Sequence, residues 1–211
     1  MPYKGPHISI PPQRLIPRVL GLDYEEFKTW PESVQDLGLE LAAELFMVRY
    51  NPFLDPDTVW ESVQRTFGQE TKALSREYAQ ALKDSLSAFW SDFKNDQEFR
   101  EEIIKRLKDF LPRDCIDTRP NSRVECSTDA TDLRMELPLF VLFPENTEQI
   151  RGIVRLANEM DFAIIPRGGG SGLTGGAIPG DRRSVVLSLA RLKQVLSVDE
   201  KNKLMCLQSG V

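Results

Sequence analysis

A cluster of glycines is the part of the sequence whose residue types point most directly to chemistry. Seven of the chain's thirteen glycines lie between Gly168 and Gly180. Glycine adopts positive φ angles at no steric cost, so successive backbone N–H groups can turn toward one side, and a ligand can approach without meeting a Cβ atom. A concave row of N–H groups binds anions, and phosphate is the usual occupant. The cluster therefore predicts a site for a phosphate-bearing cofactor.

Two familiar phosphate motifs do not account for this loop. Gly170 to Gly175 satisfies the G-x-G-x-x-G pattern, but a Rossmann site also needs a helix directly after the turn. Pro179 and Gly180 follow here instead, and no Gly-Lys-Ser/Thr sequence closes the stretch as a P-loop requires. The pattern favours two strands joined by a loop that wraps a pyrophosphate with backbone amides. A long glycine-rich surface turn is the alternative, and the polar side chains at the entrance and within the loop count against it.

The segments around the loop predict strands and a helix that would position it. Residues 162–165 and 185–189 are apolar, β-branched runs bounded by Gly or Pro, as buried strands are. Residues 140–143 predict a further strand, and residues 148–159 predict a helix with Thr147 as its N-cap. A strand–helix–strand unit of this kind should be parallel and right-handed. At the end of the chain, a hairpin is expected from 194–198 and 203–208, with a turn at 199–202.

The region before Pro112 predicts a helical extension after a proline-rich arm. The arm should be extended and contains Pro2, Pro6, Pro11, Pro12 and Pro17. The aromatic residues Trp30, Trp60 and Trp90 fall at helical positions and are expected in the core. Helix boundaries are expected at a capping box from Thr29 to Glu32, a cap at Asp55-Pro56, a break or bend at Gly68 and a cap at Asn95-Asp96.

Composition limits the possible partners and compartments. A net charge of −5 and an isoelectric point near 5.1 argue against nucleic acid or an anionic membrane as the main partner. Neither a signal peptide nor a membrane-spanning run is apparent, so the cytoplasm is the expected compartment. Cys115, Cys126 and Cys206 form no C-x-x-C pair, and the single histidine, His7, has no partner ligands. No metal site is therefore expected, and no catalytic role is given to His7.

An ordered set of motifs in the second half of the chain resembles a known family. Residues 139–150, 164–176 and 186–192 resemble the FAD-binding domain (PCMH-type) of the vanillyl-alcohol oxidase superfamily. They are most similar to its glycolate oxidase and D-lactate dehydrogenase branch. Residues 126–134 resemble the lead-in of very large bacterial members that fuse the flavin domain to a C-terminal iron–sulfur part. The resemblance extends from about Arg123 to Val211, and implies FAD as cofactor.

The resemblance also implies roles for individual residues. Pro144 would lie beside the adenosine half of FAD, and Gly175, Gly176 and Ala177 would continue the wall of the site toward the flavin. The loop has no His or Cys, so FAD would be held non-covalently, and catalytic residues would lie outside this chain. The residues expected to wrap the pyrophosphate are Arg167, Gly168, Gly169, Gly170, Ser171, Gly172, Leu173 and Thr174.

These observations predict an α+β chain, with a helical extension over residues 1–112 and an incomplete PCMH-type FAD-binding α/β domain over residues 113–211. The expected function is the FAD-binding portion of an oxidoreductase that oxidises a 2-hydroxy acid, of the D-lactate or glycolate type, by hydride transfer to FAD. The electron acceptor stays open. The chain is expected to be an N-terminal fragment that is inactive alone, with any iron–sulfur cluster beyond it.

Two alternatives stay open at this stage. One is a superfamily reductase with another substrate, against which the helical extension and the lead-in over residues 129–132 count. The other is a non-enzymatic helical interaction module with a vestigial flavin domain.

Overall fold

The computed structural model describes residues 10–131 and 136–211, in two compact units that divide between Gln97 and Glu98. The lead-in motif over residues 126–134 therefore lies partly outside the described residues. Pro2, Pro6 and His7 lie wholly outside them. The chain combines helices with one four-stranded and one two-stranded sheet, which confirms the predicted α+β class. A division into domains at Pro112 stays a proposal.

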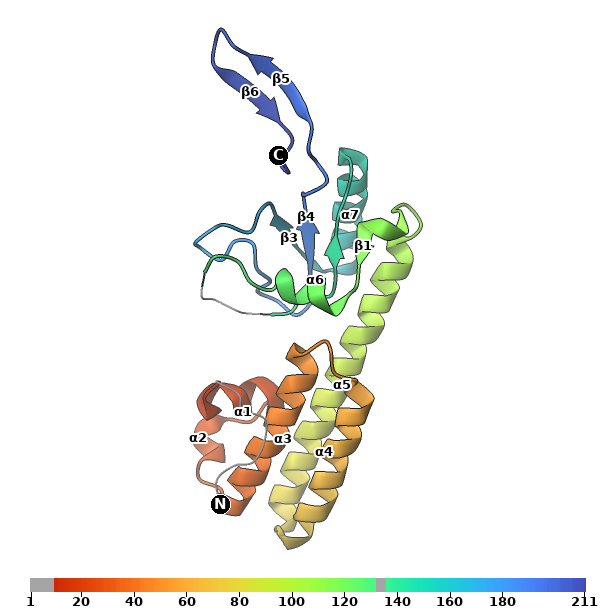
Figure 1. Ribbon diagram of the computed structural model, residues 1–211. Helices are drawn as coiled ribbons and strands as arrows, with labels where there is room; N and C mark the ends of the chain where they lie inside the picture. The colour runs from red at the N-terminus through yellow and green to blue at the C-terminus, as the bar shows by residue number, and fades with distance from the viewer. Residues whose placement is uncertain (1–9, 132–135) are drawn as a thin grey trace. The chain divides into compact units, whose positions relative to one another are not determined.

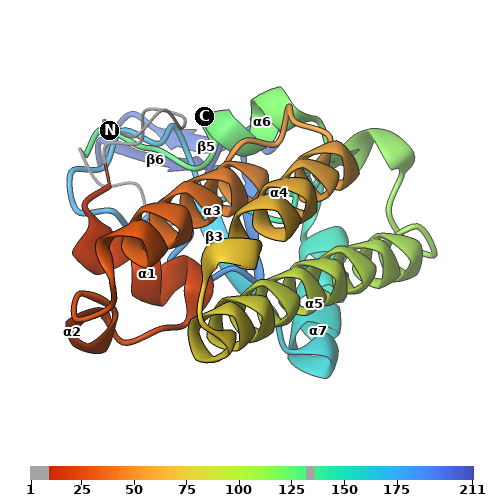
Figure 2. The same ribbon diagram turned by 90° about the horizontal axis from the view of Figure 1, so that it is seen from below.

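The first unit is built from helices around an apolar core (Figures 1 and 2). Leu41 and Leu45 of α3, Val63 of α4 and Leu82 of α5 are fully buried in one cluster. Stacking of the Trp60 and Trp90 rings, with centroids 4.6 Å apart, joins α4 to α5. The elements that enter this unit are α1 (Pro12–Leu20), α2 (Tyr24–Phe27), α3 (Glu32–Tyr50), α4 (Pro56–Glu70), η1 (Thr71–Ala73) and the first part of α5 (Arg76–Leu107).

The cap predicted at Asp55 is confirmed, because its carboxylate accepts a hydrogen bond from the backbone N–H of Thr58 at 2.9 Å and Pro56 follows at the first helical position. The stretch predicted to break or bend at Gly68 does break, but only after Glu70, where α4 ends. The helix start predicted at Asn95-Asp96 is wrong, because α5 runs through both residues. Apolar side chains at helical spacing on either side of that point keep the helix continuous.

Two further predictions in this region are corrected. Thr29 does not cap α3, because its hydroxyl donates back to the carbonyl oxygen of Glu26 at 2.7 Å. The proline arm is not extended from Pro12 onward, since α1 begins there and buries Leu15 and Ile16. A proline at the first helical position loses no hydrogen bond, which permits this start.

The second unit holds the predicted α/β elements. β2 (Val141–Leu142), α7 (Thr147–Met160), β3 (Ala163–Arg167) and β4 (Ser184–Ser188) lie close to the ranges expected from the sequence. The N-cap of α7 is Asn146 rather than Thr147, since the Asn146 side chain accepts from the backbone N–H of Gln149. The other elements of this unit are η2 (Arg113–Cys115), β1 (Ile116–Asp117), α6 (Pro120–Glu125) and the predicted hairpin of β5 (Val195–Asp199) and β6 (Leu204–Leu207).

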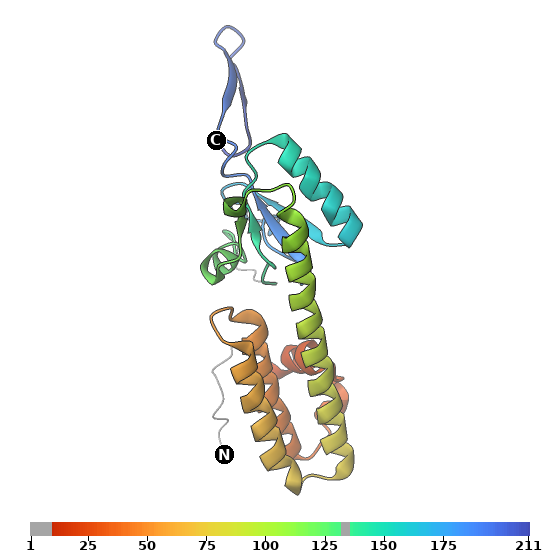
Figure 3. The same ribbon diagram turned by 90° about the vertical axis from the view of Figure 1, so that its right-hand side faces the viewer.

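The strand order β1-β2-β4-β3 puts β4 at the centre of the sheet. β4 pairs in parallel with both β2 and β3, whereas β1 pairs antiparallel with β2. The strands β2 and β3 joined by α7 are therefore parallel, as predicted. Helix α7 and the C-terminal turns of α5 lie beside the sheet (Figure 3). They share a buried core with Val185 and Leu187 of β4. The glycine loop thus connects two adjacent parallel strands without a helix.

Candidate functional site

The carboxyl ends of the three parallel strands bring the predicted site residues to one edge of the sheet. Arg167 at the end of β3 is in register with Ser188 of β4, and Leu142 of β2 is in register with Leu187. Pro144, which is buried, and Gly168 therefore leave the sheet on the same side. They are separated by two strand spacings, or about 10 Å. This edge is where parallel sheets place their ligands.

Arg167 holds the start and the end of the glycine loop together. Its Nη1 atom donates to the carbonyl oxygen of Thr128 at 2.8 Å and to that of Ala177 at 3.2 Å. Gly170 has a φ angle of 68°, and a Cβ atom there would lie 2.3 Å from the Arg167 Nη2 atom. The loop therefore requires glycine at position 170 to pack over the guanidinium. Arg167 thus contacts the loop at Gly170 and Ala177, and its positive charge lies next to the loop.

The first part of the loop presents unpaired backbone donors. Among the residues that the structure describes, none accepts a hydrogen bond from the backbone N–H groups of residues 168–176. A Cβ atom built on Gly168, Gly172 or Gly176 would meet nothing within 4 Å, and one on Gly169 would meet only the Ser171 Oγ atom at 4.0 Å. The chain itself does not fill the space beside these glycines. A pyrophosphate fits this cradle, because it needs several N–H donors and a close backbone approach.

The rest of the loop is anchored to the protein. Ile178 and Pro179 are buried, and the carbonyl oxygen of Pro179 accepts from the backbone N–H of Glu136 at 3.1 Å. Leu173, in contrast, is 77% exposed, and Ser171 and Thr174 are exposed as well. The loop thus combines a fixed end with an accessible row of donors, as a preformed anion site requires.

The segment before residue 132 supports the loop from the other side of Arg167. Two hydrogen bonds from Thr131, donated by its hydroxyl and its backbone N–H, lower the pKa of the Asp129 carboxyl, and the charge of Arg167 lowers it further. Cys126 is buried nearby, and burial raises the pKa of its thiol, so it stays protonated at neutral pH. Nothing in the local sequence indicated that Thr128 would accept from Arg167, because the two residues are far apart in the chain.

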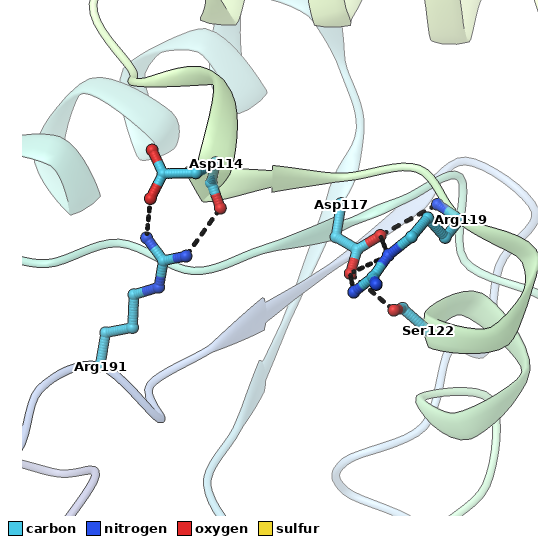
Figure 4. A network of polar contacts seen from close by, with 5 residues as sticks. All are labelled: Asp114, Asp117, Arg119, Ser122 and Arg191. Atoms are coloured by element: carbon cyan, nitrogen blue, oxygen red, sulfur yellow. Dashed lines mark hydrogen bonds and ion pairs between the residues drawn. The ribbon is translucent and has the colours of Figure 1, made fainter.

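A second polar cluster at the same edge lies around Arg191 (Figure 4). Its Nη1 atom donates to the Asp114 carboxylate at 2.8 Å, to the Glu145 carboxylate at 3.1 Å and to the Cys115 Sγ atom at 3.5 Å. The possible ligand atoms of these three residues lie within 4.8 Å of one another, as in some metal sites. The Arg191 guanidinium occupies the position of a cation among these three side chains. The cluster is therefore an ion-pair network that ties η2 to the segment after β4.

Figure 4 also shows the network that fixes the end of β1. The Asp117 carboxylate accepts from the Arg119 side chain, at 2.6 Å from Nη2, and from the Ser122 hydroxyl at 2.6 Å. The hydrogen bonds from Arg119 are the main cause that holds the pKa of Asp117 well below its ordinary value, and the Ser122 hydroxyl also lowers it. This network joins β1 to α6.

The second half of the chain is similar in sequence to known flavoproteins and their FAD-binding domain. Residues 138–211 match the family model described as FAD binding domain. The glycolate oxidase subunit GlcD of Bacillus subtilis is 36% identical over 89 residues, which are 42% of this chain and 19% of that protein. The D-lactate dehydrogenase of Archaeoglobus fulgidus is 38% identical over 71 residues, or 34% of this chain and 16% of that protein. The chain thus spans about a fifth of the length of such relatives.

A solved structure of an alkyldihydroxyacetonephosphate synthase is 27% identical in sequence, with a TM-score of 0.47. The match covers 53% of this chain and 24% of the synthase chain. Over the described ranges, 10–131 and 136–211, no helix has the length and apolar character needed to cross a membrane.

Proposed function

Because residues 138–211 match the family model described as FAD binding domain, we propose that the glycine loop binds the pyrophosphate of FAD through the backbone N–H groups of residues 168–176. The observation that carries this proposal is the row of unpaired donors beside open space. Both features are needed, because a pyrophosphate must approach the backbone closely and must accept several hydrogen bonds at once.

The residues of the loop and its neighbours contribute to FAD binding in different ways. Gly168, Gly169 and Gly172 give the phosphates access to the backbone, and the exposed hydroxyls of Ser171 and Thr174 add donors. Leu173 adds its backbone N–H, and Gly175, Gly176 and Ala177 continue the wall of the site toward the flavin. Gly170 packs on Arg167, and Arg167 holds the loop closed and adds positive charge. Pro144 contacts the adenosine half from the end of β2. FAD, when bound, supplies the acceptor for a hydride.

We further propose that the protein takes part in the oxidation of a 2-hydroxy acid of the D-lactate or glycolate type. The names of two relatives, a glycolate oxidase subunit and a D-lactate dehydrogenase, support this substrate class. The loop contains no His or Cys, so the proposed FAD is not covalently attached to it. The substrate-binding and proton-abstracting residues are proposed to lie outside the present chain, as is any iron–sulfur cluster. The cytoplasm is the proposed compartment.

The pyrophosphate assignment is tested by the amide resonances of the loop. In the ¹⁵N-labelled chain, ADP and FAD should shift the amide signals of residues 168–176, whereas adenosine should leave them unchanged. Gly169→Val should abolish these shifts, because the side chain enters the cradle while the protein leaves room for its Cβ. Ser171→Ala should weaken binding only about fivefold, the equivalent of one hydrogen bond of ~1 kcal/mol.

Gly180→Val is the matched control. Its Cβ atom also meets nothing within 4 Å, but the residue lies outside the row of free donors. It should bind ADP as the unmodified chain does. Equal binding by the Gly169→Val variant, or amide shifts confined to other parts of the chain, would contradict the assignment and favour a vestigial flavin domain.

A further inference from the structure

The second unit contains a basic pocket that the FAD proposal does not use. It has a volume of about 480 Å³ and lies between the C-terminal part of α5, η2 and β1. Three cationic side chains line it: Arg100 and Lys108 from α5 and Arg113 from η2. Glu101 is the one carboxylate among its lining residues. The pocket therefore has an excess of positive charge.

The one lining carboxylate, Glu101, offsets this charge only in part. Within the part of the chain that the structure describes, Arg100, Lys108 and Arg113 form no ion pair. Arg100 donates from Nη2 to the carbonyl oxygen of Thr118 at 3.2 Å, while its Nε atom is buried without an acceptor among the described residues. Burial lowers the pKa of Arg100, and the charge of Glu101 offsets this effect only in part. A charged group in this condition gains from an anion brought beside it.

A second partly buried guanidinium adds to the field. Arg123 donates from Nε to the carbonyl oxygen of Pro138 at 2.8 Å. Burial and the nearby charge of Arg100 lower the pKa of Arg123 to about 10. The two guanidinium groups are therefore close enough for their like charges to repel. Such an arrangement is costly unless an anion offsets it.

We propose that this pocket binds a small organic anion, whose oxyanion group meets Arg100, Lys108 and Arg113. Ile104 and Ile116 also line the pocket and provide apolar walls for the body of the ligand. The volume falls in the range of small-molecule sites and exceeds what a simple inorganic ion fills. Carboxylates and phosphates share the oxyanion chemistry that arginine recognises through two parallel hydrogen bonds.

The site is separate from the glycine loop. β1, beside the pocket, and β3, which leads into the loop, are the two outer strands of the sheet, with β2 and β4 between them. No residue of the loop lines the pocket. The proposal thus goes beyond FAD binding and is independent of it.

The test uses the full 211-residue chain and four probes, followed by calorimetry and by ¹⁵N amide shifts. Phenyl phosphate and benzoate carry both a head group and an apolar body, inorganic phosphate carries the head group alone, and benzyl alcohol carries the body alone. We expect saturable binding of at least one organic anion with a Kd below about 1 mM. Inorganic phosphate should bind at least about fivefold more weakly, and benzyl alcohol should not saturate. The stronger of the two organic anions identifies the head group.

Variants decide whether the pocket is the site. The double variant Lys108→Ala/Arg113→Ala removes two exposed cations and should weaken binding of the organic anion by about tenfold or more. Lys105→Ala removes the same kind of charge from the same helix, at an exposed position paired with Glu102 and outside the pocket, and should change binding less than about twofold. Arg100→Lys should also weaken binding, because a lysine cannot offer the fork of two donors.

Three results would overturn the proposal: no saturable binding up to about 10 mM, unchanged binding by the double variant, or equal binding of benzyl alcohol. The amide shifts distinguish a failure of the pocket proposal from a failure of the FAD proposal. Phenyl phosphate should move signals of residues 100–118 and should do so equally in the Gly169→Val variant. Shifts confined to residues 168–176 would assign the probe to the glycine loop and contradict the pocket.

Discussion

β4 and β5 are strands of similar composition in opposite environments. β4 reads Ser-Val-Val-Leu-Ser and is buried at each position, while β5 reads Val-Leu-Ser-Val-Asp and is exposed at each position. In β4, Val185 and Val186 have no exposed surface. In β5, the side chains of Leu196 and Val198 are both 57% exposed. The two strands therefore differ in their surroundings rather than in their apolar content.

β4 is paired along both of its edges and covered on both of its faces. It is hydrogen-bonded to β2 and β3, and Val185 packs in the core that contains Ile103 of α5 and Ile153 of α7. Val186 faces the other side, where Cys126 and Val141 are buried with it. β5 pairs only with β6, and none of the described residues forms a buried cluster over the hairpin (Figure 1).

An apolar, β-branched run therefore specifies a strand but not its burial. Strand propensity is expressed by pairing alone, as in β5 and β6. Burial requires a second layer, which α7 and α5 supply for β4. An exposed apolar ribbon of this kind is also a surface on which chains associate.

The two strands should differ most when the same negative charge is placed in each of them. Val185→Asp should unfold the second unit or destabilise it by about 4 kcal/mol or more, because the carboxylate would be buried among Ile103, Leu107 and Ile153 without a partner. Val198→Asp should cost less than about 1 kcal/mol, since its side chain stays in water. Urea unfolding followed by circular dichroism measures both. Equal losses would mean that the hairpin packs against another surface.

A smaller effect is expected at the connection between the two sheets. Gly210 donates its backbone N–H to the carbonyl oxygen of Leu192 at 2.9 Å, and a Cβ atom there would lie 2.0 Å from the carbonyl oxygen of Leu189. Gly210→Ala should therefore release the end of the hairpin from the segment after β4, at a cost of about 2 kcal/mol. Hydrogen exchange should become faster at residues 208–211. Gly180→Ala, whose Cβ meets nothing, is the control, and protection retained in Gly210→Ala would refute the contact.

Local sequence signals predicted most strands and the glycine loop, because each has a periodic or compositional mark within a few residues. The same signals failed at Asn95-Asp96, where residues that often cap helices lie inside α5. Their intrinsic cost inside a helix is below about 1 kcal/mol, which is less than the packing of the apolar face on both sides provides. Local propensity was therefore overridden by tertiary contacts.

The contacts that shape the candidate site could not be read from the sequence. Arg191 meets Asp114 and Glu145 across long stretches of chain, and Arg167 meets Thr128 in the same way. No spacing rule marks such pairs, since the sheet order brings them together. The glycine composition predicts an anion loop, whereas the open face beside Gly172 and the close packing of Gly170 on Arg167 follow from tertiary contacts that composition does not encode.

The smallest effect that distinguishes the sheet from the hairpin is a dependence on pH. Asp117 in β1 and Asp199 in β5 both have lowered pKa values, the first mainly through hydrogen bonds from Arg119 and the second through hydrogen bonds from Asn202. A carboxyl whose pKa is lowered by folding stabilises the protein above its unfolded pKa of about 3.9, and this contribution is lost as the pH falls further toward the folded value.

The Asp117 side chain is only 10% exposed, whereas Asp199 lies on the exposed strand β5. Asp117→Asn should therefore lower the stability of the second unit by about 1 kcal/mol at pH 7, and the difference from the unmodified chain should shrink as the pH falls below about 4. Asp199→Asn should leave the urea midpoint unchanged at both pH values, because water screens and replaces the interactions of an exposed carboxylate. Midpoints measured at pH 7 and pH 3 for the three proteins test this. A loss in Asp117→Asn that does not change with pH would show that the Asp117 network stabilises β1 by packing rather than by its charge.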